Sequence, residues 1–388
     1  MYLIINPGSA SKKYALYENG SEIFKAHLET EGGNLISTTV VGDREKTEKI
    51  SAEQYKNSVN YILRLLIDAR LIGSANDIGS IGVRIVAPGS YFLSNRVIDK
   101  EFLAKLKESE QKAPLHIRPE LLEIKQILEI MPGIPLVGIS DSAFHKTMPI
   151  PARLYGLPEE TAVEFEIYRY GYHGISAQSL VPKIKNTFGE GAKRTIICHL
   201  GSGSSVIAVK DGQSVDASMG FTPLEGLVMS TRIGNIDAGA VIYLAKNAGL
   251  APNELEEFFN SKCGLLGIGG SDDIRELLKL EKAGNKEAKN ALDVFAYAVK
   301  KYIGAYMATL GGLDLLIFTA TVGERSFIMR SRICAGLEEL GIVLDEDKNK
   351  AVISADGLIS ADGSKVKIAV LTTDEMGEMA RQTKELMA

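Results

Sequence analysis

Apolar and polar positions follow the same order in the two halves of this chain. Near the start, the apolar run 2–5 leads into a Gly/Ser turn at residues 6–11 and then into a second apolar run. In the second half, the apolar run 195–198 leads into a Gly/Ser turn at 199–204 and again into an apolar run. Each copy is typical of two strands joined by a tight turn. The turns stand half a chain apart in 388 residues, which indicates a duplication.

A helix and a buried strand are predicted to follow each of these hairpins. Apolar side chains recur at spacings of four and three between residues 55 and 69, and again between 292 and 306. This spacing predicts amphipathic helices. Short apolar stretches at 78–86 and 313–318 come next, and both end in a glycine turn. The pattern favours two related α/β domains over a solenoid of short repeats.

Composition narrows the class of protein. The length predicts about two domains, and 45% hydrophobic with 24% charged residues is enough for ordinary cores. No apolar run reaches the ~18 residues of a membrane span, and the start does not read as a signal peptide. Three widely spaced cysteines predict reduced thiols in the cytoplasm, without metal-ligand spacing. A net charge of −5 without a long basic run argues against a nucleic-acid partner.

The two turns are the first candidates for chemistry. Glycine and serine let backbone N–H groups and hydroxyls approach phosphate oxygens closely. Either turn alone would indicate an ordinary hairpin, but the pair indicates two loops that hold a polyphosphate from both sides. Four of the five histidines, His116, His145, His173 and His199, also lie in segments rich in Gly, Pro, Arg or Asp.

Two arginines are candidates for anion binding. Arg84 lies inside the apolar stretch 81–86, where a charge must be paired or face a cleft; the alternative is a solvent-facing arginine on an edge strand. Arg232 follows the Gly/Pro-rich segment 220–226, and its alternative is a surface ion pair. Guanidinium groups bind carboxylate and phosphoryl oxygens in bidentate fashion.

Taken in order, these segments resemble the acetate and propionate kinase family over essentially the whole chain. The likeness rests on the opening loop 6–14, the arginine strand 84–86, Ala-Pro-Leu-His at 113–116 and Asp-Ser-Ala-Phe-His at 141–145. It continues with Tyr-Gly-Tyr-His-Gly at 170–174, the loop 199–205, the long match 218–226, Asp-Ile-Arg at 273–275 and Thr-Asp-Glu at 373–375. No single motif decides the matter, whereas the ordered set is specific.

The resemblance implies an α/β fold of two duplicated ribonuclease-H-like domains, as in actin and hexokinase, with a cleft between them. The implied N-terminal domain is 1–145 plus 376–388, on the acyl side, and the implied nucleotide-binding domain is 146–375. The implied activity is reversible, direct in-line transfer of the γ-phosphoryl group of ATP to acetate, giving acetyl phosphate and ADP. Mg²⁺ is the implied metal, with Mn²⁺ as an alternative, and a homodimer is the implied assembly.

The resemblance also implies roles for individual residues. Arg84 would hold the carboxylate, and Arg232 with His173 would stabilise the phosphoryl oxygens. Asp141 and Glu375, with Asn6, would organise the metal. The small acyl pocket would be formed by Val86, Leu115, Tyr172 and Pro223. Phosphate and nucleotide contacts would come from Asn6, Ser9, Ser11, Lys13, His199, Gly201, Ser202, Gly203, Ser204, Asp273, Ile274, Arg275, Thr321, Val322, Gly323 and Arg325.

The chain departs from the family pattern near the expected nucleotide. Ala320 and Thr321 stand where the family has two glycines, and a Cβ there can block a positive-φ turn or clash with a nucleotide. Ser202, Ala177 and Tyr172 replace an asparagine, a second histidine and a phenylalanine, and Ile233 and Asn235 also differ. Three alternatives therefore stay open: propionate as acceptor, another nucleotide or pyrophosphate as donor, or a non-catalytic nucleotide-binding switch. The retained Arg84, Asp141, His173, Arg232 and Glu375 weigh against the switch.

Overall fold

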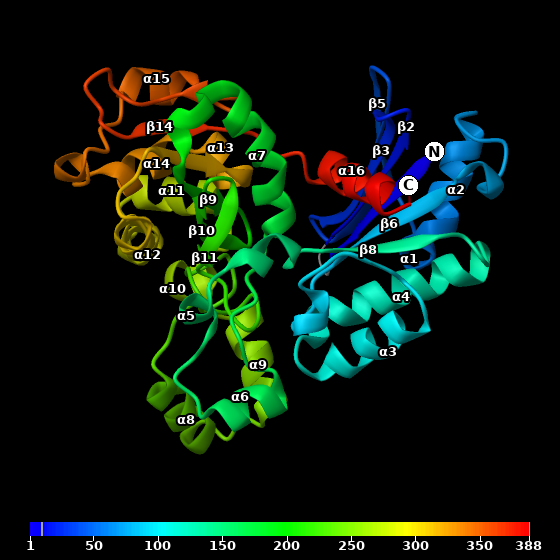
Figure 1. Ribbon diagram of the computed structural model, residues 1–388, viewed down its shortest axis with the longest axis horizontal. Helices are drawn as coiled ribbons and strands as arrows, with labels where there is room; N and C mark the ends of the chain where they lie inside the picture. The colour runs from blue at the N-terminus through cyan, green and yellow to red at the C-terminus, as the bar shows by residue number, and fades with distance from the viewer. Residues whose placement is uncertain (9–10, 388) are drawn as a thin grey trace. The chain divides into compact units, whose positions relative to one another are not determined.

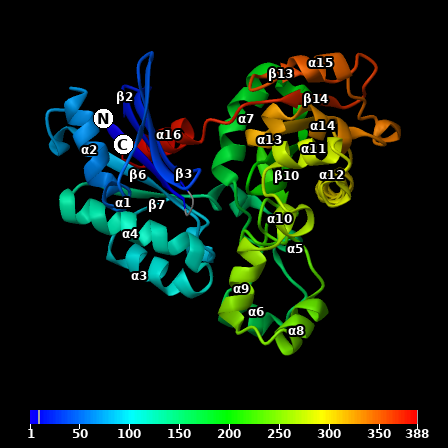
Figure 2. The same ribbon diagram turned by 180° about the vertical axis from the view of Figure 1, so that it is seen from behind.

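A computed structural model describes residues 1–8 and 11–387 of the chain. The chain divides into two compact units (Figure 1), namely Met1–Ala143 with Asp374–Ala388, and Phe144–Thr373. Each unit is built on one mixed sheet with helices packed against it, as the view from behind also shows (Figure 2). The two units are called unit 1 and unit 2 below.

Unit 1 contains the N-terminal strands and the C-terminal helix. Its strands are β1 (Tyr2–Pro7), β2 (Ser11–Glu18), β3 (Ser21–Glu31), β4 (Asn34–Val41), β5 (Arg44–Lys49), β6 (Ser80–Ile85), β7 (Arg96–Val97) and β8 (Leu136–Ser140). Its helices are α1 (Ala52–Lys56), α2 (Ser58–Asp68), α3 (Lys100–Glu108), α4 (Pro114–Ile130) and α16 (Glu375–Met387).

The sheet of unit 1 runs in the order β5-β4-β3-β2-β1-β6-β8-β7. β1 pairs antiparallel with β2 and parallel with β6, and β6 pairs parallel with β8. Helix α16 packs across β1, β6 and β8. Gly82 permits this close packing, because a Cβ at that position would lie 2.1 Å from Oγ1 of Thr383 in α16.

Unit 2 holds the second copy of the sheet and most of the helices. Its strands are β9 (Arg194–Leu200), β10 (Ser204–Lys210), β11 (Gln213–Ala217), β12 (Leu315–Thr319), β13 (Gly357–Leu358) and β14 (Lys367–Val370). Its helices are α5 (Ile150–Arg153), α6 (Glu159–Phe165), α7 (Gly174–Phe188), α8 (Ala238–Asn247), α9 (Pro252–Ser261), α10 (Gly264–Gly269), α11 (Ile274–Lys282), α12 (Lys286–Leu310), α13 (Ala320–Arg325), α14 (Phe327–Cys334) and α15 (Glu346–Ala351). Over residues 1–8 and 11–387, no helix combines the length and the apolar character needed to cross a bilayer.

The two sheets share one strand order, which confirms the predicted fold class of two duplicated α/β units. Unit 2 runs β11-β10-β9-β12-β14-β13, and its six strands correspond in order to β3-β2-β1-β6-β8-β7 of unit 1. In both units, the first strand pairs antiparallel with the second and parallel with the strand that follows the predicted amphipathic helix, α2 in unit 1 and α12 in unit 2. Unit 1 adds β4 and β5 beyond β3 at one edge of its sheet, and the sequence analysis did not predict these two strands.

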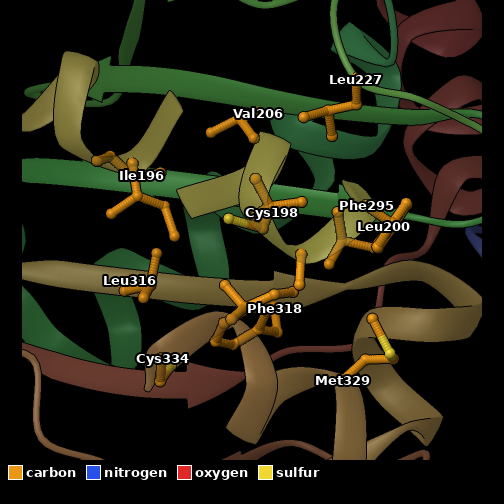
Figure 3. Packing of buried hydrophobic residues seen from close by; sticks show 14 of the residues in the cluster. Ile196, Cys198, Leu200, Val206, Leu227, Phe295, Leu316, Phe318, Met329 and Cys334 are labelled. Atoms are coloured by element: carbon orange, nitrogen blue, oxygen red, sulfur yellow. The ribbon is translucent and has the colours of Figure 1, made fainter. Parts of the chain in front are cut away.

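The core of unit 2 fixes the strands that carry the candidate site. Figure 3 shows Cys198 of β9 and Phe318 of β12 lying close together, with Met329 and Cys334 of α14 beside them. All four side chains are buried. Burial of such side chains stabilises each by about 1.5–3 kcal/mol relative to exposure. Both strand ends that lead into predicted nucleotide loops are therefore held by the same apolar cluster.

Candidate active site

In unit 1, Arg84 joins two other predicted site residues, so that the three form one cluster. Its Nη2 lies 2.9 Å from Oδ2 of Asp141, which directly follows β8, and its Nη1 lies 3.3 Å from Oδ1 of Asn6 on β1. β6 lies between β1 and β8, so the alternative of an edge-strand arginine is wrong. Parallel strands present their carboxyl ends at one edge of the sheet, which explains why these three side chains meet.

Charge explains how an arginine is kept at this position. Burial alone would lower the pKa of Arg84, but the nearby carboxylates of Asp141 and Glu375 raise it above its ordinary value. Glu375 is the first residue of α16. Arg84 is therefore cationic at all working pH values, with part of its side chain exposed and available to an anion.

Val86 and Leu115, the two predicted acyl-pocket residues of unit 1, have different surroundings. Val86 is buried, and its backbone N–H donates to Oε1 of Glu120 at 2.8 Å. Leu115, near the start of α4, is 41% exposed.

Burial raises the pKa of Glu120 to about 8, and the neighbouring Arg84 only partly offsets this. Glu120 was missed by the sequence analysis, because nothing in the pattern of α4 marks it as different from a surface glutamate.

The first Gly/Ser turn joins β1 to β2. Asn6 is buried on β1, Ser11 begins β2, and the side chain of Lys13 is exposed. Ser9, also predicted to contact phosphate, lies outside the described residues.

In unit 2, two of the predicted histidines stack on each other. The rings of His173 and His199 lie 4.1 Å apart between centroids, with 22° between their planes. Nδ1 of His173 is 2.9 Å from Oγ of Ser205, and Nδ1 of His199 is 2.7 Å from Oγ of Ser176. Each serine thus fixes the orientation of one ring. Ser176 is a further residue that the sequence analysis missed.

Gly203 lies where His173 and Arg232 converge. A Cβ at this glycine would be 3.2 Å from Nε2 of His173 and 3.5 Å from Nη1 of Arg232. The second Gly/Ser turn therefore places an open backbone position against an imidazole nitrogen and a guanidinium. A guanidinium, together with an imidazole whose Nε2 carries the proton, suits the oxygens of a phosphoryl group.

Ser230 links this turn to the segment predicted to contact adenosine. Its N–H donates to the carbonyl of Ser202 at 3.2 Å, and its hydroxyl donates to the carbonyl of Asp272 at 2.9 Å. Asp273 caps α11 and pairs with Arg275, whose side chain is 85% exposed. The side chain of Ile274 is buried in the core, so any nucleotide contact from it would come from its backbone.

The 320–325 turn, which forms α13, also borders the second Gly/Ser turn. A Cβ at Gly201 would lie 3.7 Å from the methyl group of Ala320. Thr321 and Arg325 are exposed, Val322 packs against the core, and Gly323 lies against Phe318. The structure thus gathers the 201–204 turn, Arg232, the 272–275 segment and the 320–323 turn on one part of unit 2.

Tyr172 and Pro223, the remaining acyl-pocket predictions, lie on the adjoining loops of unit 2. The hydroxyl of Tyr172 donates to the carbonyl of Phe221 at 2.7 Å, so the group that distinguishes it from phenylalanine is satisfied by backbone. The carbonyl of Pro223 accepts from Nη1 of Arg232 at 3.3 Å.

Arg169 and Glu225 hold this loop in place. Nη1 of Arg169 donates to the carbonyl of Ala217 at 3.1 Å, and Nη2 lies 2.7 Å from Oε1 of Glu225. Tyr155 donates to the other oxygen of Glu225. Sequence analysis did not assign these three residues, whose partners come from separate segments.

Comparison with known proteins gives the family. The model of the family described as "Acetokinase family" matches residues 1–381. The chain belongs to the acetokinase family. It is 42% identical to the acetate kinase of Dictyoglomus thermophilum, over 98% of both chains. It is 40% identical to that of Clostridium botulinum strain Loch Maree, over 100% of this chain and 99% of the relative.

Solved structures of acetokinases agree with the fold. The acetate kinase of Porphyromonas gingivalis superposes with a TM-score of 0.88 at 34% identity, covering 100% of this chain and 99% of that one. A propionate kinase from Francisella tularensis gives a TM-score of 0.91 at 32% identity, covering 99% of both. The predicted family and the predicted enzyme class, a phosphotransferase with a carboxyl group as acceptor, are confirmed.

Proposed function

We propose that this acetokinase transfers the γ-phosphoryl group of ATP reversibly to acetate, forming acetyl phosphate and ADP. The observation that carries the proposal is the convergence of His173 and Arg232 on Gly203 in the second Gly/Ser turn. Donors around an open backbone position suit a phosphoryl group whose charge is spread over its oxygens.

The chemistry asks for positioning and charge neutralisation rather than for a base. Short carboxylic acids have a pKa of about 4–5 and are already ionised at neutral pH. The barrier is the approach of one anion to another. In this proposal Arg84 binds the carboxylate, while Arg232 and His173 neutralise the phosphoryl oxygens. Asp141, bonded to Arg84, fixes the direction of that guanidinium.

We also propose that Mg²⁺ is held by Asp141 and Glu375, with Asn6 nearby. Carboxylate and amide oxygens are the ligands that this ion prefers, and it usually keeps several waters and substrate phosphates. Residues 1–8 and 11–387 hold no cluster of three or more His, Cys, Asp or Glu side chains able to bind a metal. The bound ion would neutralise charge on the transferring phosphate.

A trapped-product assay tests the proposal. Acetate, propionate and butyrate would each be offered with ATP, GTP or pyrophosphate, and the acyl phosphate captured as its hydroxamate. Arg232→Ala is expected to lower kcat about 10²–10³-fold, as for loss of one transition-state donor. Arg64→Ala, an exposed arginine of α2, is the matched control. Arg84→Lys should raise the KM for acetate and leave the KM for ATP unchanged.

The outcomes separate the candidates. Acetate-dependent product from ATP that is lost in Arg232→Ala supports the proposal. Product only with propionate, the substrate named for the Francisella tularensis relative, would change the acceptor. Product only from pyrophosphate or GTP would change the donor. Nucleotide binding without acid-dependent transfer would favour a non-catalytic switch.

A homodimer is the assembly that we propose. Large apolar side chains are exposed on α5, on α6 and on α8 of unit 2, namely Ile150, Val163, Phe165, Ile242 and Tyr243, all more than 50% exposed. Exposed apolar side chains of this kind mark interaction surfaces when they form a patch. Light scattering should give twice the mass of one chain, and Phe165→Asp should shift it toward the monomer. The three free thiols suit a cytoplasmic location, which is part of the same proposal.

A further inference from the structure

Arg330 of α14 is a fully buried arginine without a carboxylate partner. Its relative exposure is 0%, and none of the described residues forms an ion pair with it. Burial lowers the pKa of Arg330 to about 10. A buried charge of this kind is costly unless every donor is satisfied.

Backbone and amide oxygens satisfy all five N–H groups. Nε donates to Oδ1 of Asn349, and Nη2 donates to the carbonyls of Asn349 and Val352, each at 2.7 Å. Nη1 donates to the carbonyl of Gly323 at 2.8 Å and to that of Glu324 at 3.0 Å. Arg330 thus ties α15 to the last turn of α13.

The helix that carries Arg330, and its partner Asn349, are held in place by buried contacts. Met329 and Cys334, on the same helix as Arg330, are buried in the core of unit 2 (Figure 3). Asn349 is itself fully buried, and its Nδ2 donates to the carbonyl of Phe327 and to Oγ of Ser331. Movement of Arg330 would therefore break several buried contacts.

The first residue of α13 is held by the side chain of Glu324. The carboxylate of Glu324 accepts from the N–H of Ala320 at 3.0 Å and from that of Thr373 at 3.4 Å. The last carbonyls of a helix have no partner within it, and a cation there is favourable. Glu324 and Arg330 therefore clamp this six-residue helix at both ends.

The clamped helix α13 begins at a residue with a strained backbone conformation. Ala320 has φ +62°, in the left-handed region that alanine rarely adopts. Strained residues of this kind persist only where their surroundings hold them. The methyl group of Ala320 lies 3.7 Å from the position that a Cβ of Gly201 would take. The strained residue is therefore next to the second Gly/Ser turn.

We propose that Arg330 is a positioning residue for the phosphoryl donor. It holds α13 through Gly323 and Glu324, keeps Ala320 in its left-handed conformation against Gly201, and so sets the affinity for nucleotide. The inference rests on the proposed role of the 201–204 turn in binding phosphate. Carboxylate binding by Arg84 in unit 1 is independent of it.

Calorimetric binding of ADP tests the inference without any turnover, with KM values as the second measurement. Arg330→Lys keeps the charge and loses the five-donor geometry; it should weaken ADP binding about tenfold and raise the KM for ATP equally. The KM for acetate should change less than twofold. Arg332→Lys is the matched control, because Arg332 lies on the same helix but pairs with Glu281 and Asp293. It should bind ADP as the wild type does.

Ala320→Gly supplies a readout that general instability would not move. Glycine adopts the left-handed conformation freely, so it needs the clamp less. In the Ala320→Gly background, Arg330→Lys should weaken ADP binding less than threefold. The same tenfold loss in both backgrounds, or an equal rise in both KM values, would overturn the inference.

Two further results keep the inference separable from the proposed function. If Arg330→Lys does not fold, Glu324→Met removes the other end of the clamp and should weaken ADP binding in the same direction; unchanged ADP binding in Glu324→Met would count against the inference. Wild-type protein that binds ADP but transfers no phosphate to any acid would overturn the proposed function alone. The comparison of ADP binding between the wild type and the Arg330 variants would still decide the inference about Arg330.

Discussion

Glu120 shows how much one buried group in this protein depends on its surroundings. Its Oε1 accepts from the N–H of Val86, and in the described part of the chain its Oε2 has no hydrogen-bond partner. Burial raises its pKa to about 8, against an ordinary value of 4.5. Glu120 is therefore protonated at neutral pH in the folded protein and ionised in the unfolded chain. This difference makes the free energy of unfolding depend on pH.

We predict that Glu120→Gln becomes more stabilising, relative to the wild type, as pH rises from about 4.5 to about 8. In this range the folded state binds one more proton than the unfolded state, so the wild type loses stability with a slope of at most about 1.4 kcal/mol per pH unit. Glutamine mimics the protonated side chain and does not titrate. Urea unfolding of both proteins at pH 5, 6, 7 and 8 measures the difference. A difference independent of pH would show that Glu120 is ionised in the folded protein.

Single residues also mark how far sequence alone could go. The pairing of Arg84 with a carboxylate was predictable, because a charge within an apolar strand must find a partner. The contacts of Glu120 and Arg330 were not, because most of their partners are backbone groups of other elements: Val86 for Glu120, and Gly323 and Val352 for Arg330. No periodicity records such contacts. They exist only after the strands and helices have packed.

At the level of elements, β2 is tied to two helices by a buried polar network. Nζ of Lys12 lies 2.8 Å from Oε2 of Glu123 on α4 and 2.6 Å from Oγ of Ser58 on α2. Tyr14 donates to the other oxygen of Glu123, and burial raises the pKa of Tyr14. This network therefore anchors the start of β2, which begins at Ser11.

We predict that Lys12→Met lowers the free energy of unfolding by about 3–5 kcal/mol, since it leaves the carboxylate of Glu123 buried and unpaired. Adding Glu123→Gln removes that charge and keeps acceptors for Tyr14 and Ser58, so the double variant should recover most of the loss. Far-UV circular dichroism in urea suits a chain without tryptophan. Lys105→Met, which breaks an exposed pair with Glu108, should cost less than about 1 kcal/mol. Equal losses in the single and double variants would rule out a charge penalty.

The elements themselves were largely predictable, and the reason is local. Helix spacing identified α2 and α12, because a helix with one buried face has apolar residues every three or four positions. Short apolar stretches identified β6 and β12, because a strand that is buried on both faces is apolar throughout. Strands β4 and β5 were missed, since β5 is polar throughout, β4 lacks a regular alternation of apolar and polar residues, and their pairing extends one edge of the sheet. Their place is decided by pairing: β4 pairs with β3, and β5 pairs with β4.

At the scale of the whole molecule, the duplication gives each unit one cluster of candidate groups. Unit 1 holds Arg84 with Asp141 and Asn6. Unit 2 holds Arg232, His173 and the turns around Gly201. Under the proposed function, each substrate has its principal contacts in a different unit. The two ligands should therefore leave different marks on backbone dynamics.

We predict that ADP with Mg²⁺ slows amide hydrogen exchange mainly in unit 2, at 199–205, 229–235, 271–276 and 318–325. Acetate alone should slow exchange mainly around 84–86 and 139–142 in unit 1. A ligand at 100 times its Kd stabilises the bound state by about 2.7 kcal/mol, which slows exchange about a hundredfold where opening requires release of the ligand. Exchange followed by mass spectrometry resolves these segments.

Arg84→Lys should abolish the effect of acetate and keep that of ADP, because Arg84 lies outside the unit that would bind the nucleotide. Protection by ADP confined to unit 1 would contradict the assignment of the nucleotide to unit 2, and with it the roles proposed for Arg232 and the 201–204 turn.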